Sequence, residues 1–139
     1  MYFDEDMLLD IRLNILNKHV SKFIICEASY NHNGENKKIK FDIQKFKKFK
    51  DKIIFLPLDK QPDNLVKIEN NLNTDIDAAI LDNALKRENF QRNYLSKGIE
   101  KFDEEDLICI SDIDEIPNLE NFKYKKKLLF SSMKCFSTN

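Results

Sequence analysis

The sequence predicts an α/β protein with a mostly parallel sheet flanked by helices. The first observation behind this prediction is alternation: short apolar runs of strand length alternate with segments whose apolar residues recur at helical spacing. The second is that the strand-like runs are apolar throughout. A strand with one face in water would alternate apolar and polar residues, whereas a continuous apolar run is typical of a parallel sheet covered on both faces.

The first expected element is a helix within residues 4–20, with Asp4 or Asp6 as its N-cap. Its apolar positions at helical spacing are Leu8, Ile11 and Ile15. Two strands are expected next, at residues 22–28 and 52–58. In the polar loop after the first strand, Gly34 is expected to adopt a positive φ, because glycine does so without steric cost.

Two further helices are expected. The segment 41–52 places apolar residues three apart over a lysine-rich surface, at Ile43, Phe46 and Phe49. A longer helix should start from a cap at Thr74 or Asp75 and end near Gly98, a plausible C′ residue. Its candidate buried positions are Ile76, Ile80, Ala84, Phe90 and Leu95. A third strand follows at residues 106–111.

The composition narrows the class of protein. The 139 residues are enough for a single domain, and 42% apolar residues can form a modest core. With 23 basic and 24 acidic residues the net charge is −1, which argues against a nucleic-acid-binding surface. The chain has only 2 glycines, so a glycine-rich phosphate-binding loop is excluded.

The three cysteines and the terminal segment indicate a chain made in a reducing compartment. Cys26 and Cys109 lie inside apolar runs and are expected to be small core residues, and Cys135 is distant from both in sequence. The acidic start does not resemble a signal peptide, and no apolar stretch is long enough for a transmembrane segment. We therefore expect a cytoplasmic protein.

The strand expected at 106–111 ends in a cluster of carboxylates, Asp112, Asp114 and Glu115, closed by Pro117. Like charges this close repel one another unless they are solvated or share a cation. The cluster is therefore either a solvated turn or a site for Mg²⁺ or Mn²⁺, which prefer oxygen ligands. Position favours a site, because ligands of parallel sheets bind at the carboxyl ends of the strands, where Glu27 is also expected.

The segment "KRENFQRN" is a second unusual cluster, on the long helix. Arg87 and Arg92 are five residues apart, so their directions diverge by about 140° on a regular helix. We expect one of them, but not both, to reach the ligand edge. Glu88 and Arg92 have the spacing of an i,i+4 ion pair. A surface ion pair with Phe90 buried against the sheet is the simplest interpretation of these residues taken alone.

Taken together, these segments resemble glycosyltransferase family 17, the family of the β-1,4-mannosyl-glycoprotein β-1,4-N-acetylglucosaminyltransferases. The resemblance runs from about Tyr2 to Asn121. Four stretches carry it in the family's order: "FDEDMLLDIRLNIL", "VSKFIICEASYNHNGENK", "RENFQRN" and "ISDIDEIPN". The resemblance implies a GT-A-type (Rossmann-like) fold and inverting transfer from UDP-N-acetylglucosamine to a mannose-type or other glycan acceptor, with Mn²⁺ (or Mg²⁺).

The resemblance also implies roles for individual residues. Asp112 and Asp114 would be the D-x-D pair, with Asp114 contacting the metal and Asp112 facing the ribose or a metal-bound water. Glu27 would border the nucleotide pocket, and Arg87 or Arg92 would reach the donor. The catalytic base is not identified by these motifs.

The acceptor-binding half of the family would lie beyond the segment that carries the resemblance. Residues 1–139 are therefore expected to be a single, incomplete domain that binds UDP-sugars with at most slow hydrolysis of the donor. Two alternatives remain open from the sequence. One is a haloacid-dehalogenase-like phosphohydrolase, which also has a D-x-D after a strand; the other is an inactive nucleotide-sugar-binding module.

Overall fold

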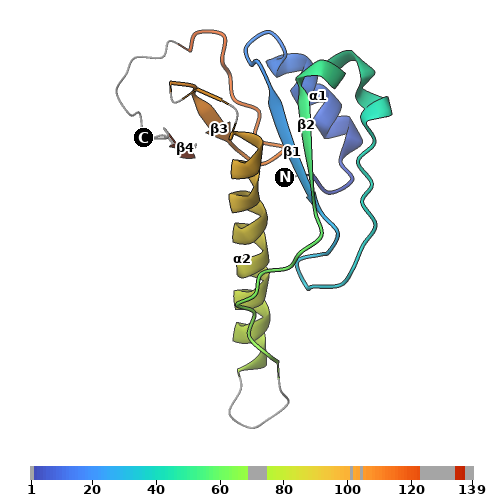
Figure 1. Cartoon of the computed structure of the whole chain (residues 1–139), viewed down its shortest axis with the longest axis vertical. Helices are drawn as coiled ribbons and strands as arrows, with labels where there is room; N and C mark the ends of the chain where they lie inside the picture. Colours follow the sequence, from blue (N-terminus) through green and yellow to red (C-terminus); the bar gives the residue numbers. More distant parts are fainter. Residues whose placement is uncertain (1, 69–74, 101, 104, 123–133, 137–139) are drawn as a thin grey trace.

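The structure is a computed structural model that describes residues 2–68, 75–100, 102–103, 105–122 and 134–136. Its elements in chain order are α1 (Asp6–Leu16), β1 (Phe23–Ala28), the 3₁₀ helix η1 (Ile43–Lys52), β2 (Ile53–Leu58), α2 (Ile76–Tyr94), the 3₁₀ helix η2 (Leu95–Gly98), β3 (Ile108–Ile110) and β4 (Lys134–Phe136). Figure 1 shows α1 and η1 on one side of the β1–β2 pair and α2 on the other.

The predicted parallel pairing is present between β1 and β2. The strands run in register from Phe23 opposite Ile53 to Ala28 opposite Leu58. Side chains of β1 alternate between two cores: Phe23 and Ile25 pack with α1 and η1, whereas Cys26 and Ala28 pack on the side of α2. Helices therefore cover both faces of the strand pair, which explains why β1 is apolar nearly throughout.

The apolar face of α1 differs from the expected one. The helix buries Leu9, Leu13 and Leu16, while Ile11 and Ile15 are 44% and 48% exposed. Apolar residues follow two stripes along this helix, and periodicity alone does not say which one meets the core. The N-cap position is Glu5, rather than Asp4 or Asp6.

The predicted helix over 41–52 is confirmed as a helical segment but is a kinked 3₁₀ helix. Asp42 caps its start by accepting a hydrogen bond from the Gln44 amide at 2.9 Å. Phe46 and Phe49 are buried in the same core as α1. Apolar residues three apart suit a 3₁₀ helix, in which side chains at i and i+3 lie on one line.

The long helix α2 begins as expected, because the Asp75 side chain accepts a hydrogen bond from the Ala78 amide at 3.1 Å. Its predicted buried face is only partly confirmed, because Phe90 and Leu95 are partly buried against the core of Cys26 and Ala28. Ile80 is 46% exposed and Phe90 is only half-buried, whereas Ala79, Asn83 and Gln91 are buried. Two of those three are amides, and a search for apolar periodicity passes over them.

The amides on α2 hold neighbouring backbone. Asn83 donates to the Val66 carbonyl at 2.8 Å and accepts from the Val66 amide at 2.7 Å. Gln91 donates to the Cys26 carbonyl in β1 at 3.2 Å. These contacts fix α2 against β1 and against the loop after β2, so buried polar groups on this helix are satisfied rather than costly.

Gly98 ends the helical stretch, as expected, but not through a positive φ. Gly34 is the glycine in the left-handed region, with φ 92°. At Gly98 a Cβ atom would lie 2.7 Å from Cγ2 of Ile24, so this glycine allows η2 to approach β1 closely. No helix in the described part of the chain is long and apolar enough to cross a membrane.

The expectation of one mostly parallel sheet is only partly met. The third strand is shortened to Ile108–Ile110 and pairs antiparallel with β4, an element that the sequence did not predict. β3 therefore belongs to a separate two-stranded sheet and does not extend the β1–β2 pair. At Cys26, the free edge of β1 already accepts hydrogen bonds from the Tyr2 amide and from the Gln91 side chain.

Candidate functional site

The acidic turn, defined here as residues 111–117, follows β3 and has two distinct sides. Ile113 and Ile116 pack against the core formed by α1, β1 and η1. Asp114 and Glu115 are exposed, and the Asp112 side chain is 51% exposed. Apolar side chains thus anchor the turn while its carboxylates face solvent. The turn itself is closed by a 3.1 Å hydrogen bond from the Glu115 amide to the Asp112 carbonyl.

Arg12 of α1 binds this turn from the core side. Its Nη1 donates to the carbonyls of Asp112 and Glu115, both at 2.8 Å, and its Nη2 donates to the Ser111 hydroxyl at 2.6 Å. Burial lowers the pKa of Arg12 from its ordinary value, and nearby acidic groups, Glu115 and Asp112 among them, act in the opposite direction. A cation therefore lies directly behind the carboxylate cluster.

Arg92 of α2 approaches the same turn from another direction. Its guanidinium lies 3.6 Å from Oδ1 of Asp112 and 3.0 Å from Oε1 of Glu88. The predicted i,i+4 pair between Glu88 and Arg92 is confirmed, and Arg92 also reaches the acidic turn. The like charges of the turn are thus balanced by two arginines from two different helices.

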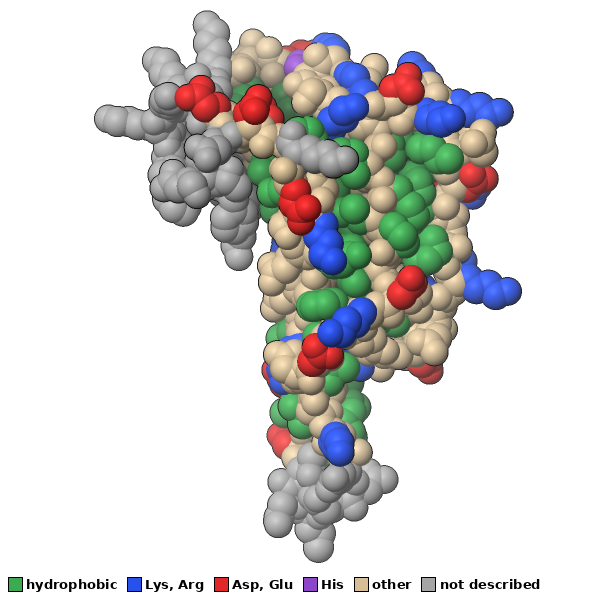
Figure 2. All heavy atoms as spheres, viewed as in Figure 1, with side chains coloured by type: hydrophobic (Ala, Val, Ile, Leu, Met, Phe, Trp, Pro, Cys, Tyr) green, Lys and Arg blue, Asp and Glu red, His purple; other side chains and the backbone are tan. Residues whose placement is uncertain are grey.

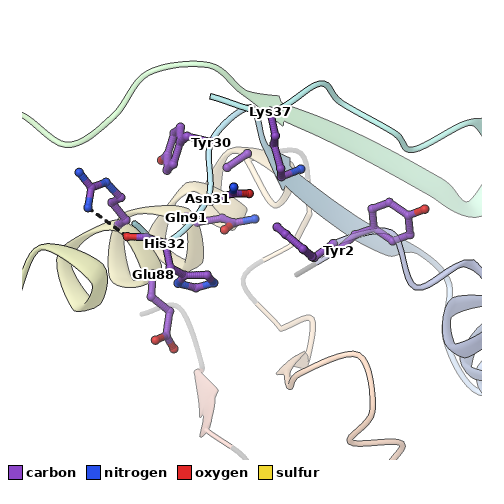
Figure 3. Close-up of a pocket in the computed structure, with 10 residues that line it drawn as sticks. Tyr2, Tyr30, Asn31, His32, Lys37, Glu88 and Gln91 are labelled. Atoms are coloured by element: carbon purple, nitrogen blue, oxygen red, sulfur yellow. Dashed lines mark hydrogen bonds between the residues drawn. The ribbon is translucent and has the colours of Figure 1, made fainter. Parts of the chain in front are cut away.

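Arg87 lies elsewhere and lines a small recess beyond the carboxyl end of β1. Figure 3 shows this recess, with Tyr30, His32 and Gln91 around it. The Arg87 guanidinium donates to the His32 carbonyl at 3.0 Å and to Oε1 of Gln61 at 2.8 Å. Both acceptors are neutral, so these bonds leave its positive charge uncompensated. The two arginines do not converge on one pocket, in agreement with their angular separation on the helix.

The recess is partly open and has a volume of about 10 Å³, room for one water molecule. Its walls combine aromatic, amide and charged side chains: Tyr2, Phe3, Tyr30, Asn31, His32, Lys37, Arg87, Glu88 and Gln91, with Ala28. Glu88 is shared between the recess and the ion pair with Arg92. Through Glu88 and Arg92, the recess is therefore connected to Asp112 of the acidic turn.

Glu27 lies near the carboxyl end of β1, as expected, but it is fully buried. Its carboxylate accepts hydrogen bonds from the Lys37 ammonium at 2.6 Å, from the Lys40 amide at 3.1 Å and from the Phe41 amide at 2.9 Å. A carboxylate so fully paired holds the returning loop against β1. Because Lys37 lines the recess, Glu27 helps to fix the wall of the recess by holding the Lys37 ammonium.

The expectation that Glu27 and Asp112 share one edge of a single sheet is not met, because β1 and β3 belong to different sheets. The physical link runs through α2 instead. Gln91 contacts the carbonyl of Cys26, next to Glu27, and the adjacent Arg92 contacts Asp112. Neighbouring residues of one helix thus connect β1 with the acidic turn.

A larger cavity, of about 560 Å³, opens between α1, β1 and the segment that contains β3. Its size suits a small-molecule ligand. Most of its lining is apolar, including Leu13, Ile25 and Ile108, with Arg12 and Arg92 among the charged residues. Such walls suit a diphosphate poorly, because burying its charge among apolar groups is costly.

Sequence reasoning missed Arg12 and Lys37. Arg12 was not singled out because its partners lie about a hundred positions away and are mostly backbone carbonyls, which leave no trace in a sequence. Arginine is rare in this lysine-rich chain, at positions 12, 87 and 92. That rarity could have drawn attention to Arg12, because arginine is preferred where several acceptors are bound at once.

The acidic turn offers the type of ligand that a divalent ion arriving with a substrate would require. In the described part of the chain, no three His, Cys, Asp or Glu side chains are grouped as a metal site of protein ligands alone. Mg²⁺ in nucleotide sites is commonly held by one or two carboxylates together with substrate phosphates. Asp112 and Asp114 offer such oxygen ligands at a solvent-facing position.

Comparison with known proteins shows the family of the chain. The family model for glycosyltransferase family 17 matches residues 1–129, which is most of the chain. The chain is therefore a member of glycosyltransferase family 17. Comparisons with curated proteins and with solved structures gave no match. The family match also replaces the haloacid-dehalogenase-like interpretation of the D-x-D sequence.

Proposed function

We propose that this glycosyltransferase binds UDP-N-acetylglucosamine with Mn²⁺ or Mg²⁺ and belongs to the inverting, GT-A-type enzymes that transfer N-acetylglucosamine to a mannose-type or other glycan acceptor. The family membership supports the reaction class. The observation that carries the proposal within the site is the acidic turn, whose carboxylates face solvent while two arginines balance their charge from behind and beside.

In this proposal Asp112 and Asp114 hold the metal ion. When bound, the ion offsets the charge that develops on the diphosphate leaving group. Arg92 orients Asp112 and would offer its positive charge to a phosphate oxygen bound there. Asp114, the most exposed of the pair, is the main metal ligand.

Arg87, beside the recess, forms the second part of the proposed donor site. Arg87 carries a charge that its two neutral partners leave uncompensated, which favours an anionic ligand nearby. The exposed His32 provides a ring surface beside it, whereas the ring of Tyr30 is buried in the wall of the recess. Glu27 acts indirectly, by fixing the loop that carries Lys37.

The proposed donor sugar rests on the family resemblance, and the described residues do not include a carboxylate that we assign as the catalytic base. A catalytically inactive nucleotide-sugar-binding module is therefore the second candidate function. The two candidates share donor binding and differ in turnover. Over this face of the molecule basic side chains lie interspersed with acidic ones (Figure 2), in keeping with a small-molecule donor rather than a nucleic-acid partner.

Titration calorimetry tests the proposal. The chain is titrated with UDP, UDP-N-acetylglucosamine and GDP, each with Mn²⁺ and with EDTA. We expect binding of both uridine ligands that requires the metal, and weaker binding of GDP. Equal affinity for UDP and GDP, or UDP binding that is indifferent to EDTA, would contradict the proposal. A second assay, for transfer of N-acetylglucosamine to a mannose-containing acceptor, then distinguishes the transferase from the inactive module.

A further inference from the structure

Arg12 makes contacts that an ordinary ion pair would not make. Its three short hydrogen bonds reach the Asp112 carbonyl, the Glu115 carbonyl and the Ser111 hydroxyl, all within the acidic turn. A fourth, longer contact of 3.5 Å reaches the Ile113 carbonyl. A planar guanidinium can satisfy several acceptors in fixed directions, whereas a lysine ammonium is a point charge on a flexible stem.

These contacts leave the carboxylates unoccupied by Arg12. Its partners are backbone carbonyls and a hydroxyl, so the positive charge is placed behind the turn without blocking the oxygens of Asp112 or Asp114. A cation in this position reduces the repulsion between neighbouring carboxylates. It also fixes the backbone from which both side chains project.

We propose that Arg12 is a positioning residue for the donor and metal site, acting through the backbone of the acidic turn. This role rests on the proposed function, because it requires Asp112 and Asp114 to bind the metal with the donor diphosphate. Residues that orient metal ligands typically contribute about 10–100-fold to metal affinity. Arg12 differs from Arg92, which contacts the Asp112 side chain itself.

The test compares Arg12→Lys and Arg12→Gln with a matched control, Lys18→Gln. Lys18 follows the end of the same helix and contacts a nearby part of the chain, through Glu120 at 2.8 Å. That pair is 66% and 65% exposed. Exposed pairs contribute little to stability. Two measurements are made on each variant: Mn²⁺-dependent UDP affinity, and amide hydrogen exchange of peptides that cover residues 107–119.

We expect both Arg12 variants to lose about 10–100-fold in Mn²⁺-dependent UDP affinity, and Lys18→Gln to stay within about twofold of the wild type. Exchange should accelerate at the Glu115 and Ile116 amides, which donate to carbonyls within the turn, and remain unchanged in β1 and β2. In Arg12→Ala, added methylguanidinium should restore part of the affinity, whereas methylammonium should not.

The outcomes separate this role from the proposed function. Absence of metal-dependent UDP binding by the wild-type chain would overturn both. Binding by the wild type together with unchanged affinity in Arg12→Lys and Arg12→Gln would overturn the positioning role alone. Faster exchange throughout β1 and β2 in both variants would also overturn it, because Arg12 would then support the fold as a whole.

Discussion

The guanidinium of Arg92 lies between two carboxylates, 3.0 Å from Glu88 and 3.6 Å from Asp112. Glu88 lines the recess at the end of β1, and Asp112 belongs to the acidic turn. A single arginine therefore joins the two parts of the candidate site. Since its side chain is only about one-third exposed, its charge is screened less than that of a surface residue.

Replacing Arg92 tests this connection. Arg92→Met should weaken Mn²⁺-dependent UDP binding by about 1–2 kcal/mol, because a charge-assisted contact near the diphosphate is lost. Titration calorimetry measures the change. Lys86→Met is the control, since Lys86 lies on the same helix and pairs with Asp82 at 2.6 Å. An equal loss of UDP affinity in the two variants would show that Arg92 does not contribute specifically to donor binding.

Glu27 provides a prediction about stability. Glu27→Gln should lower the free energy of unfolding by about 3–5 kcal/mol, because it leaves the largely buried Lys37 ammonium without a charged partner. Chemical denaturation followed by circular dichroism gives this value. Glu35→Gln, on the exposed surface of the same loop, should change it by less than about 0.5 kcal/mol. An average substitution costs about 1 kcal/mol. A loss in Glu27→Gln below about this value would mean that other contacts hold the loop.

The parts of the fold that sequence analysis predicted are those set by local patterns. Apolar runs gave β1 and β2 to within one residue, and Asp75 was correctly identified as an N-cap. The positive φ of Gly34 also followed from its loop. Each of these depends on neighbouring residues, which a sequence displays directly.

The remaining features depend on contacts between distant segments. Packing against the core decides that α1 buries Leu9 and not Ile11. The partners available at the strand edges decide that β3 pairs with β4 and not with β1. The candidate carboxylates were visible in the sequence, whereas Arg12, which binds their backbone, was not. Long-range hydrogen bonds to carbonyls have no residue type of their own, so no motif reports them.

Stability should fall at alkaline pH. Burial raises the pKa of the Cys26 thiol from 9.0 to about 11, and it also raises the pKa of Tyr2 and Tyr30. The folded state holds these protons more tightly than the unfolded state. The contribution of Cys26 is therefore complete below pH 9 and is lost as the pH rises toward 11, whereas the contributions of the two tyrosines are lost only above pH 10.

Cys26 alone should account for about 2–3 kcal/mol of this loss. Urea denaturation at several pH values between 8 and 11 measures it, at the range set by the Cys26 shift. Cys26→Ala should show a shallower decline, although its stability at pH 8, below that range, will be lower. A wild-type curve that is flat across this range would contradict the burial of the thiol.

Gly34 should be intolerant of substitution. Its φ of 92° is strained for other residues, and an added Cβ would overlap Nη2 of Arg87. Gly34→Ala should therefore cost at least about 1 kcal/mol of stability and displace Arg87 from the recess. Thermal unfolding measures the first effect, and UDP affinity measures the second. Unchanged stability would show that Gly34 is not required for the turn. Unchanged UDP affinity would show that Arg87 is not part of the donor site.

The most direct test of the donor site is the metal dependence of UDP binding in Asp114→Asn, measured by calorimetry with Mn²⁺ and with EDTA. Asp51→Asn, an exposed carboxylate next to the start of β2, is the control. We predict that the wild type and Asp51→Asn bind UDP only with Mn²⁺, and that Asp114→Asn loses most of this metal-dependent affinity, because one charge is removed from a site that depends on charge. Metal-dependent binding that persists unchanged in Asp114→Asn would contradict the assignment of the acidic turn.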